Sequence, residues 1–268
     1  AYYLARTGRP GPVVLDFPKN AQTEKAVYEE QTVNFIRSYI AFPQPKESEL
    51  KAAAELINNA KKPLALIGQG VELVCAQEEL KTFLEKADIP AGRTMLGLSA
   101  LSSNHPLNVG MLGMHGNLAP NLKQQEADVV VAIGMRFSDR VTGNLKTYLK
   151  QAKIIHLDID NAEINKNVHT DVAIVANCKD SLPLLTELVN KASHKEWIES
   201  FKPLNEREKK RVIEKATHPE EGPLLMGEVV NAVAEATKGM SVTVTDVGQN
   251  QLFATRYSKY NTPRSIIT

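Results

Sequence analysis

The chain has 268 residues, 43% of them hydrophobic and 24% charged, and a formal net charge of +1. A charge this close to neutral gives no electrostatic basis for binding nucleic acid or an anionic membrane, so neither is predicted as a partner. The two cysteines, Cys75 and Cys178, lie in apolar stretches typical of small buried side chains, and the absence of any apolar run near the roughly 20 residues of a membrane span favours a cytoplasmic or organelle-matrix protein.

The first residues have the pattern of a helix end followed by a short strand. Residues 1–5 resemble the last turns of a helix, and residues 13–17 predict a strand that Pro18 stops. Residues 21–45 mix polar, aromatic and proline residues without a sustained period, which is typical of a linker between domains. Because the chain begins on a helix end and closes on an apolar extended run, we expect a fragment of a longer protein; natural processing is the alternative.

Helices and strands alternate through residues 46–190. Helices are expected at residues 47–60, 71–86, 117–125 and 147–151, and Ser48 or a neighbour is expected to cap the first of them. Strands are expected at 64–67, within 88–93, and at 129–133, 154–157 and 172–175. Loops are expected at 94–98 and 102–110. This alternation predicts an α/β fold, a doubly wound, mostly parallel sheet with helices on both faces. Such sheets bind ligands at the carboxyl ends of their strands.

The composition changes after residue 190. Residues 194–215 form a charge-rich helical segment, and its mixed run at residues 206–211 is interpreted as a solvated face. A break at Gly222-Pro223 is followed by a predicted helix at 224–237 and a predicted strand at 241–245. A further domain therefore begins near residue 223.

Two strand-end loops have a composition that suits a planar cofactor. The first, residues 111–116 (MLGMHG), combines glycines, thioethers and one imidazole, and the second follows the apolar strand 129–133. We expect them to face each other across that cofactor, although methionines there also suit a gap-filling core. The glycine turn at residues 68–70, between a strand and a helix, predicts amide groups directed at a phosphate.

Charged residues follow two of these strands. Arg136 and Arg140 are suited to clamp a phosphate or carboxylate, or to pair with Asp139 within the domain, while Asp158 and Asp160 are suited to accept from ribose hydroxyls. No catalytic constellation, metal-ligand spacing or phosphate-loop motif is present. The residues themselves therefore predict a dinucleotide-sized cofactor in an α/β domain but no reaction.

Several motifs occur together in order: GRPGPVVLDFPKN at 8–20, LIGQGV at 66–71, GMLGMHG at 110–116, IGMRFSDRVTG at 133–143, HLDIDNAEI at 156–164 and TDVGQNQ at 245–251. Over nearly its whole length the chain resembles the acetolactate synthase (acetohydroxyacid synthase) catalytic subunits, which depend on thiamine diphosphate. The resemblance implies the tail of a pyrimidine-binding domain at 1–20, a linker at 21–45, a central FAD-binding domain at 46–190, a helical linker at 191–222 and the start of a diphosphate-binding domain at 223–268.

The same resemblance implies an FAD site. Its residues would be Arg9, Gly68, Gln69 and Gly70 near the diphosphate, Thr94, Met95, Leu96, Leu112, Gly113, Met114 and His115 around the flavin and ribityl chain, Gly134, Met135, Arg136, Arg140 and Val141 continuing the site, and Asp158 with Ile159 at the adenosine ribose. On the residues alone, His115 equally suits a hydrogen-bonded structural role. Val247, Gly248 and Gln249 would touch thiamine diphosphate, and Arg140 would help to hold a substrate carboxylate. The chain departs from the family at Gln69, Ser138, Asn177 and Asn250.

The implied activity is the decarboxylating condensation of two 2-keto acids, pyruvate with pyruvate or 2-ketobutyrate, in branched-chain amino-acid biosynthesis. FAD would be mainly structural, and thiamine diphosphate and Mg²⁺ would act in the intact enzyme, as a homodimer or tetramer with a possible regulatory small subunit. The chain alone is expected to be inactive. The alternatives are the central domain of a related enzyme, of the glyoxylate carboligase or pyruvate oxidase type, and a nucleotide-binding module without chemistry.

Overall fold

The computed structural model describes residues 1–30 and 32–268, so residue 31 of the predicted linker lies outside the described residues. The chain divides into two compact units, Ala1–Pro43 and Gln44–Thr268. The smaller unit contains α1 (Tyr2–Arg6), which confirms the expected helix end, and α2 (Lys19–Thr23). The strand expected at 13–17 was wrong: Val14 is 91% exposed, and no neighbouring strand pairs with this segment among the described residues. A strand without a partner leaves its backbone groups unpaired.

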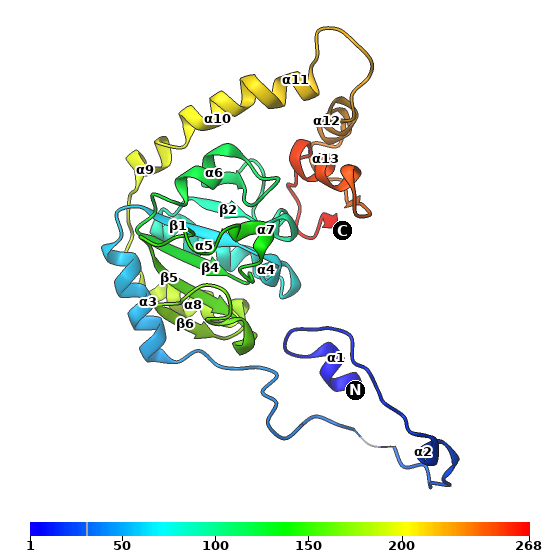
Figure 1. The fold of residues 1–268 in the computed structure, drawn as a ribbon. Helices are drawn as coiled ribbons and strands as arrows, with labels where there is room; N and C mark the ends of the chain where they lie inside the picture. The colour runs from blue at the N-terminus through cyan, green and yellow to red at the C-terminus, as the bar shows by residue number, and fades with distance from the viewer. Residues whose placement is uncertain (31) are drawn as a thin grey trace. The chain divides into compact units, whose positions relative to one another are not determined.

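The larger unit is built on one parallel sheet. Within the described residues its strands are β1 (Pro63–Ile67), β2 (Ala91–Arg93), β3 (Asn108–Met111), β4 (Val129–Ile133), β5 (Lys153–Asp158) and β6 (Val172–Val175). They are ordered β3-β2-β1-β4-β5-β6 and every neighbouring pair is parallel (Figure 1). The chain runs outward from β1 to β3 and then restarts beside β1 with β4. The predicted doubly wound α/β fold is confirmed, and its switch point lies between β1 and β4.

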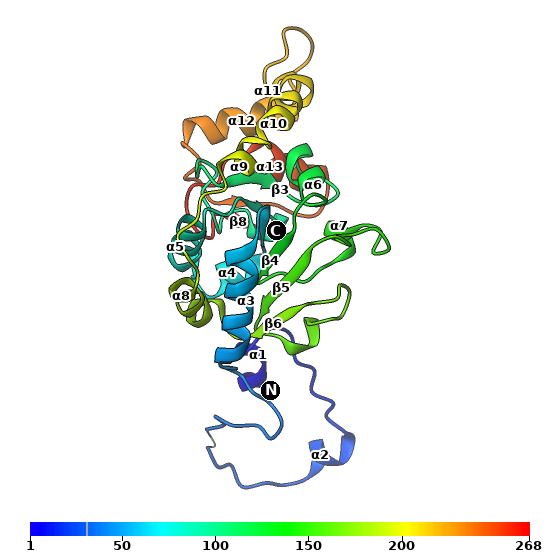
Figure 2. The ribbon, with the colours of Figure 1, turned by 90° about the vertical axis from the view of Figure 1, so that its left-hand side faces the viewer.

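Helices cover both faces of the sheet (Figure 2). One face packs against α3 (Glu47–Asn59), α4 (Gln69–Leu73), α5 (Gln77–Ala87) and α8 (Cys178–Leu188). The other packs against α6 (Leu118–Lys123) and α9 (Lys195–Glu199), and the buried rings of Trp197 in α9 and Phe201 just after it join the core. Every residue of β1 and β4 is buried, which explains why both strands read as unbroken apolar runs.

Several local predictions were wrong. The helix expected at 71–86 is two helices, α4 and α5, because the chain turns at Cys75 with a φ of 54°. Cys75 is therefore exposed, whereas Cys178 is buried as expected. The expected loop 102–110 contains most of β3, the expected helix 147–151 is a series of turns, and α3 begins after Lys46 without a side-chain cap.

The C-terminal part of the larger unit is helical. It contains α10 (Lys202–Glu208), a π-helical stretch (Lys209–Ile213), α11 (Glu214–Thr217), α12 (Met226–Ala236) and α13 (Gln249–Tyr257), with β7 (Thr243–Val244) paired to β8 (Ile266–Ile267). The helix and strand expected at 224–237 and 241–245 are confirmed. Tyr260, fully buried, packs with Leu98 and Met111 and so joins this segment to the sheet.

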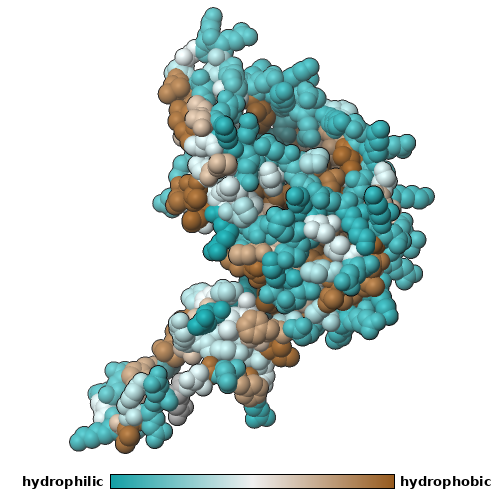
Figure 3. Space-filling view, turned by 180° about the vertical axis from the view of Figure 1, so that it is seen from behind, coloured by the Kyte–Doolittle hydropathy of each residue, from teal (hydrophilic) through white to brown (hydrophobic). Residues whose placement is uncertain are grey.

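The surface of the larger unit is mostly hydrophilic in the view of Figure 3. Hydrophobic side chains are exposed on the C-terminal segment, where Val229 and Val233 of α12 are 46% and 53% exposed and Val244 of β7 is 69% exposed. In the part of the chain that the structure describes, no helix has the length and apolar character needed to span a membrane.

Candidate functional site

The loops that the sequence singled out lie at one edge of the sheet. Because all six strands are parallel, the turns after them emerge on the same side. These turns are residues 94–96 after β2, 112–115 after β3, 68–70 after β1, 134–136 after β4 and 158–160 after β5. Residues separated by some ninety sequence positions are thus brought to one edge of the sheet.

Backbone hydrogen bonds continue across this edge beyond the strands. An amide just past one strand donates to a carbonyl at the end of its neighbour, with N···O distances of 2.8–3.0 Å: Leu112 to Arg93, Thr94 to Ile67, Gly68 to Ile133, Gly134 to Leu157 and Ala176 to Asp158. We refer to these five bonds as the strand-end belt. The belt fixes the start of each loop relative to the next one.

The two loops at the switch point are in direct contact. The Gly70 amide donates to the Gly134 carbonyl at 2.8 Å, and a Cβ atom on Gly68 would collide with that same oxygen. These glycines therefore permit a close approach of two backbones. The amides of Gly68 and Gly70 already have acceptors within the protein, and α4 has only five residues, so these two amides do not provide the expected phosphate cradle.

A dense network holds the loop at residues 111–116, which we name the histidine loop. The Met111 amide donates to Asn117 Oδ1 at 2.7 Å, and Asn121 both accepts from the Gly113 amide at 2.9 Å and donates to the Gly113 carbonyl at 2.8 Å. Sequence reasoning missed both asparagines. Their spacing of four residues, which places them on one face of α6 beside a glycine-rich loop, was the available indication.

The histidine loop also meets the segment after β4. The Met114 amide donates to the Arg140 carbonyl at 2.8 Å, and a Cβ on Gly113 would lie 2.7 Å from that oxygen. The Arg140 guanidinium approaches the Met114 sulfur, with Nη1 and Sδ 4.0 Å apart. The structure therefore brings the two loops that the sequence paired into contact through Met114 and Arg140.

The predicted residues differ in what they expose. Leu112, Gly113 and Met135 are buried in the core beneath the loops. The exposed side chains are those of Gln69, Leu96, Met114, His115, Arg136 and Arg140. Gly70, Thr94, Met95, Gly134, Val141 and Ile159 are intermediate. The edge thus presents a mixture of apolar, thioether and cationic groups, which is suited to a ligand with a flat apolar part and an anionic part.

The end of β5 contributes two carboxylates. Asp158 Oδ1 accepts from the Asp160 amide at 2.9 Å, and Asp160 Oδ1 accepts from the Ala162 amide at 3.0 Å at the start of the 3₁₀ helix Asn161–Glu163. Each carboxylate therefore organises the turn that carries it. Asp158 is buried and Asp160 is half-buried.

His156 lies beneath this edge and is fully buried. Its Nε2 is 2.8 Å from the Met135 carbonyl, which only a protonated Nε2 can satisfy, and its ring meets that of Phe137 edge-on with centroids 5.0 Å apart. Its Nδ1 has no hydrogen-bond partner among the described residues. The imidazole thereby fixes the backbone of the loop that follows β4 through a hydrogen bond to the Met135 carbonyl.

Burial lowers the pKa of His156, against the opposing pull of the Met135 carbonyl and the Asp158 and Glu163 carboxylates. In the unfolded chain this imidazole takes up a proton near the ordinary histidine pKa of 6.5, and in the folded protein it does so only at lower pH. We therefore expect the free energy of unfolding to fall as the pH drops below the ordinary histidine pKa of 6.5. Urea unfolding should show a smaller fall in the free energy of unfolding for His156→Leu than for the unchanged chain; equal falls would contradict this.

The remaining predicted residues lie in other parts of the chain. Arg9 belongs to the Ala1–Pro43 unit, and residues 247–249 are exposed where α13 begins. Asn177 caps α8 by accepting from the Lys179 amide at 2.8 Å. Among residues 1–30 and 32–268, no group of three or more His, Cys, Asp or Glu side chains could hold a metal ion.

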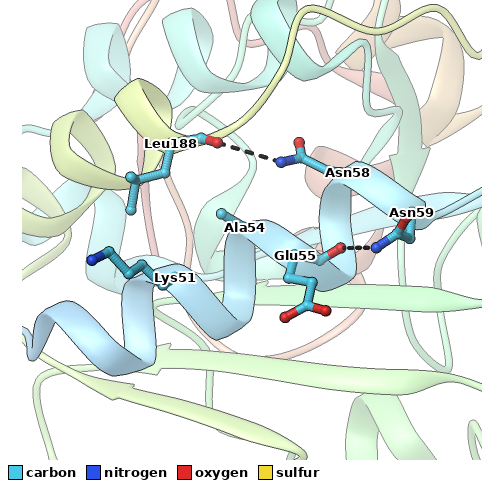
Figure 4. A pocket seen from close by; sticks show the side chains of 6 residues that line it. All are labelled: Lys51, Ala54, Glu55, Asn58, Asn59 and Leu188. Carbon is cyan, nitrogen blue, oxygen red and sulfur yellow. Dashed lines mark hydrogen bonds between the residues drawn. The ribbon is translucent and has the colours of Figure 1, made fainter.

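One surface hollow lies away from the strand-end edge, beside α3 (Figure 4). Its volume is about 320 Å³, and it is lined by Lys51, Ala54, Glu55, Asn58, Asn59 and Leu188. Asn58 Nδ2 donates to the Leu188 carbonyl at 3.4 Å across it. None of the predicted site residues lines this hollow.

Comparisons with known proteins agree with this geometry. Residues 50–185 match the family model described as the thiamine pyrophosphate enzyme, central domain. The chain is 38% identical to the acetolactate synthase isozyme 1 large subunit of Escherichia coli and 39% identical to a probable acetolactate synthase large subunit of Methanocaldococcus jannaschii, over 100% of this chain and 46% of each relative. It is 36% identical to acetolactate synthase 1, chloroplastic, of Oryza sativa, over 98% of this chain and 41% of the relative.

The chain spans about half the length of the curated relatives it matches. The family model covers the parallel sheet and most of the helices packed on it, including the strand-end belt. The chain therefore belongs to the thiamine pyrophosphate enzyme family, and it contains that family's central domain.

Proposed function

We propose that this chain is the FAD-binding part of an acetolactate synthase catalytic subunit. The relatives with that name match 98–100% of this chain at 36–39% identity, and this similarity is the main support for the proposal. The intact protein would join two 2-keto acids with loss of carbon dioxide. Since the sequence contains no catalytic constellation, this chain would provide a cofactor platform rather than the reaction.

The side chains at the strand-end edge fit the chemistry of FAD. Arg136 and Gln69, both exposed, are suited to its diphosphate, and the exposed Met114 and Leu96 are suited to the flat flavin and its ribityl chain. Asp158, at the end of β5, would accept from the adenosine ribose. When bound, FAD would supply a planar structural support, and the protein side chains would orient it and exclude water.

The remaining parts of the proposal concern the intact protein. Thiamine diphosphate would supply the electron sink for decarboxylation with Mg²⁺ at its diphosphate, and residues 247–249 would contact it. Arg140, exposed beside Met114, would hold a 2-keto acid carboxylate. A homodimer or tetramer in the cytoplasm, with a small regulatory subunit, is proposed because several relatives are named large subunits.

Titration of the purified chain with FAD tests the proposal. We expect saturable quenching of flavin fluorescence at one FAD per chain, because the edge combines groups for both halves of the molecule. Riboflavin, which lacks the diphosphate and adenosine, should bind at least tenfold more weakly, since hydrogen bonds to charged groups contribute about 1.5–3 kcal/mol. Equal binding of the two, or no binding of FAD, would contradict the assignment.

The reaction is tested separately with the full-length protein. With pyruvate, thiamine diphosphate and Mg²⁺, the full-length protein should form acetolactate, and the 268-residue chain should form none. Acetolactate from the chain alone would show that the chemistry lies within it. Full-length protein that binds FAD but forms no acetolactate would favour a different carboligase of the same family.

A further inference from the structure

Arg256 of α13 reaches the histidine loop from the C-terminal segment. Its Nη1 donates to the His115 carbonyl at 3.0 Å and to the Gly116 carbonyl at 2.8 Å, across 140 or more residues of sequence. Its Nη2 is 2.5 Å from Glu208 Oε1 in α10. One guanidinium therefore binds two loop carbonyls and one carboxylate.

Glu208 extends this connection to α6. It is 5% exposed although it lies in the charge run 206–211, which was interpreted as a solvated face, and its Oε2 accepts from the amide of Leu118, the first residue of α6. That N···O distance is 2.8 Å. Arg256 thus holds the end of the histidine loop while Glu208 holds the helix that follows it, and α6, α10 and α13 lie around the same region (Figure 1).

These contacts extend the hydrogen-bond network of the histidine loop. Asn117, Asn121 and the Arg140 carbonyl satisfy backbone groups of residues 111–114, and Arg256 satisfies the next two carbonyls. The side chains of Met114 and His115 are exposed on this fixed backbone. Because the Arg256 and Glu208 side chains are only 19% and 6% exposed, removing either one leaves the other charge poorly solvated.

We propose that Arg256 and Glu208 are a positioning pair that sets the histidine loop and couples it to α13. The loop part of this proposal rests on the observed contacts alone, and the coupling to flavin rests on the proposed function. A ligand seated on Met114 and His115 would stabilise the loop, and through Arg256 it would stabilise α13. Coupling free energies are reciprocal, so seating of α13 would in turn tighten flavin binding.

Hydrogen exchange of the 268-residue chain tests the pair, with and without FAD. In Arg256→Met without FAD, amides of residues 111–117 should exchange at least tenfold faster than in the unchanged chain, because their loop loses its hydrogen bonds to the guanidinium. Arg256→Lys keeps the positive charge but loses the several N–H donors of the guanidinium, so its exchange rate at residues 111–117 should lie between those of the unchanged chain and Arg256→Met. Arg207→Met removes an exposed arginine from the same helix as Glu208 and should match the unchanged chain.

The coupling has a separate readout. FAD should slow hydrogen exchange at residues 249–257 of the unchanged chain but not of Arg256→Met. The Kd for FAD should rise about tenfold in Arg256→Met and in Glu208→Gln, as expected for the loss of a hydrogen bond to a charged group. If the unchanged chain does not bind FAD but Arg256→Met still speeds loop exchange, the proposed function fails and the positioning pair stands. If loop exchange is unchanged in both Arg256→Met and Glu208→Gln, the pair is refuted, whether or not FAD binds.

Discussion

Replacing Gly134 with alanine is expected to lower the free energy of unfolding by about 3 kcal/mol, and to weaken FAD binding with it. The backbone φ of Gly134 is 58°, and a Cβ there would lie 2.7 Å from Gly70 Cα and 3.0 Å from the Val71 nitrogen. These are backbone atoms, so no side-chain rotation can relieve the contact. The loops after β1 and β4 would have to separate, and urea unfolding would measure the cost.

Gly143→Ala is the matched control. Its φ is 56°, almost the same as that of Gly134, but no atom lies within 4 Å of the position its Cβ would take. This variant therefore bears only the cost of a backbone conformation that L residues rarely adopt, without a steric clash. The difference in the free energy of unfolding between the two variants measures the contribution of the close backbone approach at the switch point. Equal losses of free energy would show that this approach does not contribute to stability.

Replacing Asp158 with asparagine is expected to weaken FAD binding by about 10- to 100-fold with little loss of stability. Asparagine keeps an Oδ1 that can accept from the Asp160 amide, so the turn after β5 should persist. It removes the charge and half of the acceptor capacity that a ribose hydroxyl would use. Fluorescence titration with FAD measures the change in Kd.

The control is Asp171→Asn, because Asp171 directly precedes β6 and its carboxylate contacts the opposite end of β5. Asp171 accepts from the Ile154 amide at 2.9 Å and pairs with Lys153 at 2.8 Å, where β5 begins. Losing this charge should reduce stability and leave the FAD affinity unchanged, because the residue lies away from the carboxyl ends. An equal loss of affinity in both variants would attribute the Asp158 effect to the sheet as a whole rather than to the cofactor.

The sequence predicted the central strands of the sheet well because burial on both faces leaves an unmistakable pattern. The expected strands 64–67, 129–133 and 154–157 correspond to β1, β4 and β5. β3 was missed because it is short, lies at the sheet edge and contains Gly110 with a φ of 112°. The break at Cys75 was missed because a helical period continues through the sequence there, whereas the backbone of Cys75 has a positive φ.

At the candidate site, strand-end loops could be predicted because a parallel sheet places them together whatever their distance in sequence. The resemblance to acetolactate synthases is confirmed by the relatives, while the roles of individual site residues stay predictions. Arg256 and Glu208 could not be found in this way. No periodicity relates a charge in a solvated-looking helix to an arginine 48 residues later, and only the packed structure shows that both meet residues 115–118.

The strand-end belt makes the position of the loops largely independent of the side chains that they carry. Its hydrogen bonds join main-chain atoms only, so they place no direct demand on which side chains the loops carry, apart from the glycines at the switch point. Positions such as Gln69 and Arg136, exposed just beyond the belt, are free to vary while the frame persists. Such an edge can be retargeted to a new ligand by surface substitutions, which makes this domain a promising scaffold for directed evolution of cofactor preference.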